Sequence, residues 1–195
     1  VQKGLIDRLS ATFSGRSPEL RLIDEFSRSD KRVMLLTGQS GSGKSSLLAK
    51  AVTLLSDNAC VLPFFVGADE NACSVENMLK SIVFVLSEKL NAPLCFQPNE
   101  RECDYGAILK QFYSLINTAA LERDVYLVID AINQFARTPY EADMKWLNLH
   151  SLNPNVKLII SSTPDYYQLR FIEALRPMSV NLDYFTLDDV ESVAR

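Results

Sequence analysis

The sequence has little with which to bind a transition metal. It contains one histidine, His150, and four cysteines that lie far apart, at Cys60, Cys73, Cys95 and Cys103. Zinc sites usually take their ligands from closely spaced cysteines and histidines, and no C-x-x-C pair occurs in this chain. The sequence therefore argues against a zinc site. It favours reduced thiols, which are typical of cytoplasmic (intracellular) proteins.

The sequence also lacks an excess of positive charge and a long apolar run. Twenty Lys and Arg stand against 24 Asp and Glu, which gives a formal net charge of −4 at pH 7. A chain with this balance has no overall basic field, so we do not expect this domain to bind nucleic acid directly. No apolar run reaches the roughly 20 residues that span a membrane, so no membrane partner is expected either.

The size and composition are those of one globular domain. The chain has 195 residues, of which 47% are hydrophobic, and this is enough to bury a core. It begins with Val1 rather than methionine and stops at Arg195 within a helix-like stretch. We therefore expect the sequence to be part of a longer protein.

What the sequence does contain is a complete phosphate-binding motif. Residues 38–45 read Gly-Gln-Ser-Gly-Ser-Gly-Lys-Ser and fit G-x-x-x-x-G-K-[ST] without a mismatch. The apolar run at 32–37 predicts a buried strand before the motif, and the amphipathic stretch at 46–52 predicts a helix after it. A flexible Gly/Ser turn is the alternative, but strand, glycine loop and helix in this order favour a phosphate site.

Each residue type in the motif has a physical role in binding a nucleotide. Glycines let the backbone curl until its N–H groups approach phosphate oxygens, and the helix start adds unpaired N–H groups and a positive dipole end. Lys44 supplies a mobile charge for the β- and γ-phosphates, and the Ser45 hydroxyl is suited to Mg²⁺. The candidate nucleotide-binding residues of this segment are Gly38, Gln39, Ser40, Gly41, Ser42, Gly43, Lys44, Ser45 and Ser46.

A second apolar strand, predicted at 125–130, ends in a carboxylate. Asp130 is the residue type that a Walker B element needs to hold Mg²⁺ opposite Ser45, although a strand-terminal Asp that caps a turn is the alternative. Hydrolysis also needs a group that orients water, and the chain offers the amides of Asn133 and Gln134 where an acid is usual. We take Lys44, Asp130 and Gln134 as the candidate catalytic residues.

The rest of the pattern alternates strands and helices. Further strands are predicted at 60–66, with Pro63 at an edge or bulge, at 156–162 and at 178–185. Helices are predicted at 1–12, 17–29, 44–56, 74–90, 104–121, 140–149 and 165–175, with another from 186; Ser17 is the expected N-cap of the second helix.

This alternation predicts an α/β fold, a three-layer α/β/α P-loop NTPase with a mostly parallel five-stranded central sheet. Because the carboxyl ends of parallel strands meet at one edge, residues 38–45, Asp130 and residues 161–163 should converge there.

Four segments resemble one family of P-loop proteins. Phe13-Ser14-Gly15-Arg16 followed by Glu19-Leu20 is similar to the F-x-G-R-x-x-E-L segment that opens STAND-class NTPases, and the Walker B stretch 125–135 resembles their NACHT-like branch. Residues 63–86 are similar to the corresponding segment of nephrocystin-3, the telomerase-associated WD-repeat protein and NACHT-and-WD-repeat proteins. Residues 184–195 resemble the junction to a helical lid and winged helix.

The resemblance implies further roles. It places Gly15 and Arg16 by the adenine or ribose, and it makes 162–163 the sensor 1 position. Asn133 and Gln134 stand where NACHT-like proteins usually have acids, and a Ser-Ser-Thr sequence at 161–163 stands where many STAND proteins have arginine. Both departures favour a protein that keeps its nucleotide bound and does not hydrolyse it rapidly.

The resulting functional hypothesis is an ATP-binding switch module with slow hydrolysis, bound to ATP or ADP and Mg²⁺. Its expected parts are an N-terminal segment and helix (1–30), the NTPase core (31–185) and the start of a helical lid (186–195). Expected partners are other domains of the same chain (lid, winged helix, repeats) and a homo-oligomer or protein partners.

The alternatives are a scaffold that binds ATP without hydrolysis and a small phosphotransferase, for which an arginine-rich lid segment is missing. A GTPase would need an N-K-x-D tetrapeptide, which does not occur.

Overall fold

The computed structural model describes residues 2–68, 72–97, 103–136, 144 and 146–184. The chain forms three layers around a sheet with the strand order β2-β3-β4-β1-β5, and all four neighbouring pairs are parallel. This confirms the predicted α/β class and the five-stranded sheet, and makes the sheet entirely parallel. The strands are β1 (Val33–Thr37), β2 (Cys60–Phe65), β3 (Val125–Asp130), β4 (Val156–Ser162) and β5 (Met178–Asn181).

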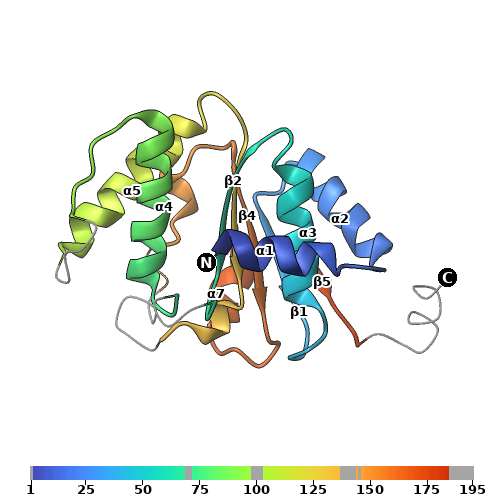
Figure 1. Ribbon diagram of the computed structural model, residues 1–195. Coiled ribbons are helices and arrows are strands. Elements are labelled where there is room, and N and C mark those ends of the chain that lie inside the picture. Colours follow the sequence, from blue (N-terminus) through green and yellow to red (C-terminus); the bar gives the residue numbers. More distant parts are fainter. Residues whose placement is uncertain (1, 69–71, 98–102, 137–143, 145, 185–195) are drawn as a thin grey trace.

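Helices cover both faces of the sheet (Figure 1). One apolar core lies under α4 and α5, and a second lies under α1, α2 and α3. Because β3 and β4 are buried along their whole length, their sequences are nearly continuous apolar runs. The helices are α1 (Gln2–Ala11), α2 (Ser17–Arg28), α3 (Lys44–Leu55), α4 (Val75–Leu90), α5 (Tyr105–Ala119) and α7 (Leu169–Glu173), with short 3-10 turns η1 (Ile132–Gln134) and η2 (Leu149–Ser151). None of the helices in the described part of the chain has both the length and the apolar character that crossing a membrane requires.

The edge strand β2 is protected by two features of the sequence. Pro63 lies in the middle of β2 and has no N–H group, so the outer edge of the strand offers one hydrogen-bond donor fewer to another strand. This agrees with the edge position predicted for Pro63. Gln2 of α1 binds the backbone of Phe65: its amide oxygen accepts from the Phe65 N–H at 2.8 Å, and its amide nitrogen donates to the Phe65 carbonyl at 3.2 Å. A helix side chain therefore takes the place of a neighbouring strand.

Two predicted helix boundaries are wrong. Ser17 is the first residue of α2 rather than its N-cap, because Gly15 and Arg16 are both left-handed (φ 74° and 56°) and turn the chain into the helix one residue earlier. The helix predicted at 165–175 is shortened to α7, because the residues before it form turns. The Tyr166 N–H reaches the Thr163 carbonyl, and the Leu169 N–H reaches the Tyr166 carbonyl.

Half of the helix predicted at 140–149 lies outside the described residues. In its described part the chain is not α-helical: Met144 has φ 49°, and η2 begins at Leu149. The strand predicted to reach 185 ends at Asn181, with residue 185 outside the described part. The helix predicted from 186 is likewise outside it. The other predicted strands and helices are present within two residues of their expected limits.

A buried lysine fixes α2 to the sheet. Lys157 of β4 donates to three carbonyls at the C-terminal end of α2, those of Phe26 (3.1 Å), Ser27 (2.8 Å) and Ser29 (2.6 Å). Its Nζ also lies 5.4 Å from the centre of the Phe26 ring. The Phe26 carbonyl also accepts from the Ser29 N–H, and the Ser27 carbonyl from the Tyr126 hydroxyl. Because all three carbonyls lie at the negative end of the helix dipole, a cation is favoured there. Burial lowers the pKa of Lys157, while the charges of Asp124 and Asp30 act in the opposite direction.

Substitution of this lysine should destabilise the fold. Lys157→Met keeps the aliphatic stem but removes the charged donor that the three carbonyls share, and hydrogen bonds to charged groups are each worth about 1.5–3 kcal/mol. We expect urea unfolding to show a loss of about 2 kcal/mol or more, whereas Lys110→Met on the exposed side of α5 should change stability by less than about 0.5 kcal/mol. Equal stability of the two variants would contradict this role of Lys157.

Candidate functional site

The loop at 38–45 joins the carboxyl end of β1 to the first turn of α3. Gly43 is the N-cap of α3, with φ 90° and no side-chain hydrogen bond to the helix start, and Gly41 has φ 83°. Such angles suit glycine, and they leave a set of N–H groups without an acceptor among the described residues. These are the backbone N–H groups of Gly41, Gly43, Lys44, Ser45 and Ser46. Unpaired N–H groups at a helix start form a site for an anion.

Gly38 is required where the loop leaves β1. A Cβ at this position would lie 2.6 Å from the Leu182 carbonyl oxygen and 2.6 Å from Ser42 Oγ. The Leu182 N–H in turn donates to the Thr37 carbonyl at 2.7 Å. The first glycine of the motif therefore lets the loop pack against the chain that follows β5.

Lys44 is held within the loop. Its Nζ donates to the carbonyls of Gly38 (2.6 Å) and Gln39 (2.8 Å), and the residue is 8% exposed. Burial lowers the pKa of Lys44, and the charge of Asp130 opposes that effect. The ammonium group is thus positioned beside the N–H cluster by two carbonyls of the same loop.

Asp130 lies at the carboxyl end of β3 and is buried. Its carboxylate accepts from Ser161 Oγ at 2.5 Å, and the same Ser161 oxygen accepts from the Ala131 N–H at 2.8 Å. Burial raises the pKa of Asp130; hydrogen bonds from Ser161 and Ser45, the charge of Lys44 and the Ala131 backbone act in the opposite direction. Among these partners, Ser45 and Lys44 come from the loop.

The residues after β3 turn back towards the loop. Ala131 has φ 54° and starts η1, where Asn133 Oδ1 accepts from the Thr163 N–H at 3.3 Å. The Gln134 amide oxygen lies so close to Gly67 that a Cβ there would be 2.7 Å from it. Asn133 is therefore fixed to the end of β4, whereas Gln134 lies against the turn after β2.

These segments enclose one pocket of about 380 Å³. It is lined by Ser40, Gly41, Gly43, Lys44, Ser45, Ser46, Asp130, Ala131, Asn133, Gln134 and Thr163. The structure therefore brings the loop, Asp130 and the end of β4 together at one sheet edge, as the sequence predicted. Of the three residues at the end of β4, only Thr163 lines the pocket: Ser161 is bound to Asp130, and Ser162 is fully buried.

Gly15 and Arg16 are not among the residues that line this pocket. The Arg16 guanidinium reaches the loop from its outer side, where Nη2 donates to the Ser42 carbonyl at 3.1 Å. The role at the adenine or ribose that the resemblance implied remains a prediction. Sequence reasoning did not single out Tyr184, whose hydroxyl donates to the Ser40 carbonyl at 3.3 Å. No sequence signal marks this contact, because it joins residues 144 positions apart.

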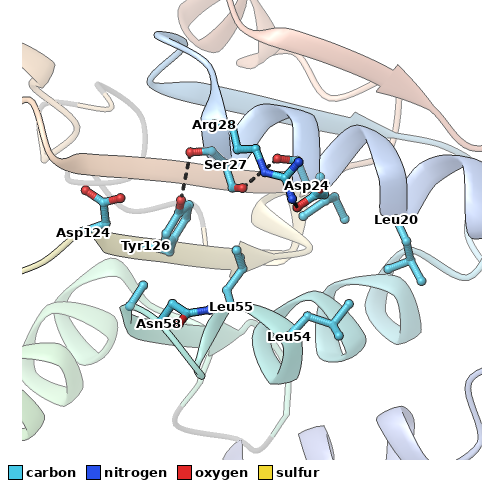
Figure 2. A pocket seen from close by; sticks show the side chains of 11 residues that line it. Leu20, Asp24, Ser27, Arg28, Leu54, Leu55, Asn58, Asp124 and Tyr126 are labelled. Atoms are coloured by element: carbon cyan, nitrogen blue, oxygen red, sulfur yellow. Dashed lines mark hydrogen bonds and ion pairs between the residues drawn. The ribbon is translucent and has the colours of Figure 1, made fainter.

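A second pocket, of about 500 Å³, lies at the other end of the sheet, between α2, α3 and the start of β3 (Figure 2). Its lining includes Leu20, Leu54 and Leu55 and three charged residues, Asp24, Arg28 and Asp124. The Arg28 guanidinium is already paired with the Asp24 carboxylate at 2.7 Å, and Asp124 adds a further negative charge, so this lining does not suit a phosphate. The chemistry predicted from the motif therefore belongs to the smaller pocket.

Comparisons with known proteins show the family to which the chain belongs. Residues 18–163 match the family model described as Nephrocystin 3, N-terminal. Tetratricopeptide repeat protein 41 of Mus musculus is 26% identical over 140 residues, which are 68% of this chain and 10% of that protein. Transcription activator GutR of Bacillus subtilis (strain 168) is 25% identical over 175 residues, 86% of this chain and 19% of that protein. The chain therefore spans a small part of these relatives.

The fold also matches a solved structure. The Aeropyrum pernix ORC1 protein in complex with DNA superposes with a TM-score of 0.70 and 16% sequence identity. The match covers 97% of this chain and 51% of that chain. At this level of identity the likeness concerns the fold alone.

The raised pKa of Asp130 predicts a pH-dependent stability. A carboxyl group whose pKa is higher in the folded state stabilises the fold below its ordinary pKa of 3.8, and this contribution is lost as the pH rises through the folded pKa. Without Mg²⁺, the unfolding free energy of Asp130→Asn minus that of the wild type should increase from about pH 4 towards pH 8. Urea titrations at several pH values measure this difference, with Asp7→Asn on α1 as the control. A difference that falls or stays constant with pH would contradict the burial argument.

Proposed function

The chain belongs to the nephrocystin 3, N-terminal family and is a P-loop NTPase domain related to the NACHT and AAA+ ATPases, and we propose that it binds ATP or ADP with Mg²⁺. One observation carries this proposal: five unpaired backbone N–H groups, the Lys44 ammonium and the buried Asp130 carboxylate meet at a single pocket. N–H groups and a lysine complement phosphate oxygens, and a carboxylate beside them needs a cation.

The proposed roles follow from the positions of the side chains. The N–H groups of the loop hold the phosphates, and Lys44 leaves its two loop carbonyls to bind the β- and γ-phosphates. Ser45 and Asp130, which are hydrogen-bonded to each other at the pocket, would supply adjacent hard oxygen ligands, a donor set that suits Mg²⁺. When held by these two residues, Mg²⁺ would supply positive charge that offsets the negative charge of the phosphates.

The loop is connected to both ends of the described chain, which supports a switch. We propose the parts expected from the sequence: an N-terminal segment and helix (1–30), the NTPase core (31–185) and the start of a lid (186–195). α1 packs on α3, and the chain after β5 contacts the loop through Leu182 and Tyr184. Nucleotide exchange at the loop would then change how the core holds its neighbouring domains, and so control conformation and association with a second copy or other proteins.

Hydrolysis is proposed to be slow. Asn133 and Gln134 line the pocket where a water-orienting acid would act, and Asn133 is already hydrogen-bonded to Thr163. An amide orients water but does not accept its proton, so the rate should fall well below that of a site with a general base. A scaffold that keeps ATP without cleaving it is the second candidate, and the same Asn133-Gln134 pair favours it.

Direct contact with nucleic acid is not part of this proposal. GutR is a transcription activator, and the superposed ORC1 structure is a complex with DNA. Those functions belong to proteins of which this chain covers 19% and 51%. A net charge of −4 gives this domain no general attraction for a phosphate backbone.

Removal of the loop lysine should weaken nucleotide binding strongly. In Lys44→Ala the phosphates lose their only charged partner from the loop, and we expect the Kd for MgATP, measured by isothermal titration calorimetry, to rise by about 100-fold. Lys110→Ala, an exposed lysine on α5, should bind like the wild type. If Lys44→Ala binds MgATP with unchanged affinity, the assignment of the site is wrong.

Restoring an acid after β3 should accelerate hydrolysis. Asn133→Asp is isosteric and keeps the oxygen that accepts from the Thr163 N–H, while it adds a base beside the pocket. General bases contribute about 10²–10⁴-fold, so we expect single-turnover cleavage of ATP to rise at least about tenfold. Asn58→Asp at the surface is the matched control. No gain in Asn133→Asp would count against a water-orienting role at this position.

A further inference from the structure

Two carbonyls of the phosphate loop are bound by side chains that come from outside the pocket. The Ser42 carbonyl accepts from Arg16 Nη2 at 3.1 Å, and the Ser40 carbonyl accepts from the Tyr184 hydroxyl at 3.3 Å. Neither Arg16 nor Tyr184 lines the pocket. One donor precedes the loop in sequence and the other follows β5, so the loop is held between the two ends of the described chain.

Peptide geometry connects these contacts to the phosphate site. In a trans peptide the C=O of one residue and the N–H of the next point in opposite directions, and the described part of the chain has no cis peptide. A Ser40 carbonyl turned outward therefore turns the Gly41 N–H away from Tyr184. A Ser42 carbonyl turned outward does the same for the Gly43 N–H. Gly41 and Gly43 line the pocket, and their N–H groups have no acceptor among the described residues.

We propose that Arg16 and Tyr184 are positioning residues of the phosphate loop, which set its peptide planes so that the Gly41 and Gly43 N–H groups face the phosphates. Glycine at both positions makes the opposite orientation sterically accessible, since glycine populates either sign of φ. With a flipped peptide, a carbonyl oxygen would face the phosphates and repel them. This inference rests on the proposed function, since it assumes that phosphates bind at the pocket.

The Arg16 side chain is held in place by further hydrogen bonds. Its Nη1 donates to the Glu19 carboxylate at 2.8 Å, and its side chain is 10% exposed. The Nη2 that reaches Ser42 also donates to the Asp183 carbonyl. One guanidinium thus links the loop, the start of α2 and the segment that carries Tyr184, an arrangement that suits the fixed fork of arginine and not the single point charge of lysine.

This role differs from contact with the adenine or ribose, the role implied by resemblance. A residue that contacts the base or sugar raises the affinity for nucleotides, but it does not change the affinity for a ligand that consists of phosphates alone. A residue that sets the loop's peptide planes affects every ligand with phosphates to the same degree. The two roles therefore predict different results with inorganic tripolyphosphate.

The experiment measures the Kd of Arg16→Met, Arg16→Lys and Tyr184→Phe for three probes: MgATP, MgGTP and magnesium tripolyphosphate. Tyr184→Phe removes the hydroxyl and keeps the ring. Arg21→Met, an exposed arginine on α2, is the matched control. We expect Arg16→Met to weaken all three probes by about tenfold or more and Tyr184→Phe by about threefold to tenfold. Arg16→Lys should recover only part of the loss, and Arg21→Met should behave like the wild type.

Three results would overturn the positioning role. They are unchanged affinities in Arg16→Met and Tyr184→Phe, a loss for MgATP and MgGTP without a loss for tripolyphosphate, and full recovery by Arg16→Lys. If thermal melting shows that Arg16→Met does not fold, the affinities of Tyr184→Phe provide the test, because this variant loses one oxygen atom only and should fold like the wild type. A wild-type protein that binds none of the probes would refute the proposed function itself, whereas wild-type binding with unaffected variants would refute only this inference.

Discussion

Five backbone N–H groups of the phosphate loop and the first turn of α3 meet at one pocket with no acceptor among the described residues, and the rest of the site depends on this arrangement. Most of the contacts around the site support this arrangement. Lys44 is fastened to carbonyls of its own loop, and Gly38 fits against Leu182 with no room for a side chain. These contacts shape the loop from within the protein, which should limit the conformational entropy that is lost when a ligand binds.

The parallel sheet brings the second half of the site to the loop. β1 lies between β4 and β5, so the loop is next to the end of β4, and β3 follows on the other side of β4. Ser161 connects these strands by binding both the Asp130 carboxylate and the Ala131 N–H. This hydroxyl fixes the carboxylate at the pocket, and its hydrogen bond offsets part of the free-energy cost of burying the carboxylate. An Asp exposed to water would not need such a hydrogen bond.

The strongest local patterns predicted the fold and the centre of the site. The motif at 38–45, the strand that ends in Asp130 and the edge position of Pro63 all follow from short stretches of sequence whose meaning does not depend on distant residues. The shortening of α7 and the N-cap of α2 were mispredicted, because turns with i→i−3 bonds and two left-handed residues decided them. The contacts of Arg16 and Tyr184 with the loop join residues 26 and 144 positions apart, so no local pattern could indicate them.

The central claim is that the backbone of the loop recognises phosphate. It is tested most directly by the amide NMR signals of Gly41, Gly43 and Lys44 in a ¹⁵N-labelled protein titrated with MgATP. The account predicts that these signals shift together with saturation, and that their hydrogen exchange becomes slower as the N–H groups gain acceptors. It would be contradicted if MgATP bound while these amides stayed unchanged and the largest shifts fell elsewhere, for example around Leu54 and Tyr126 in the pocket of Figure 2.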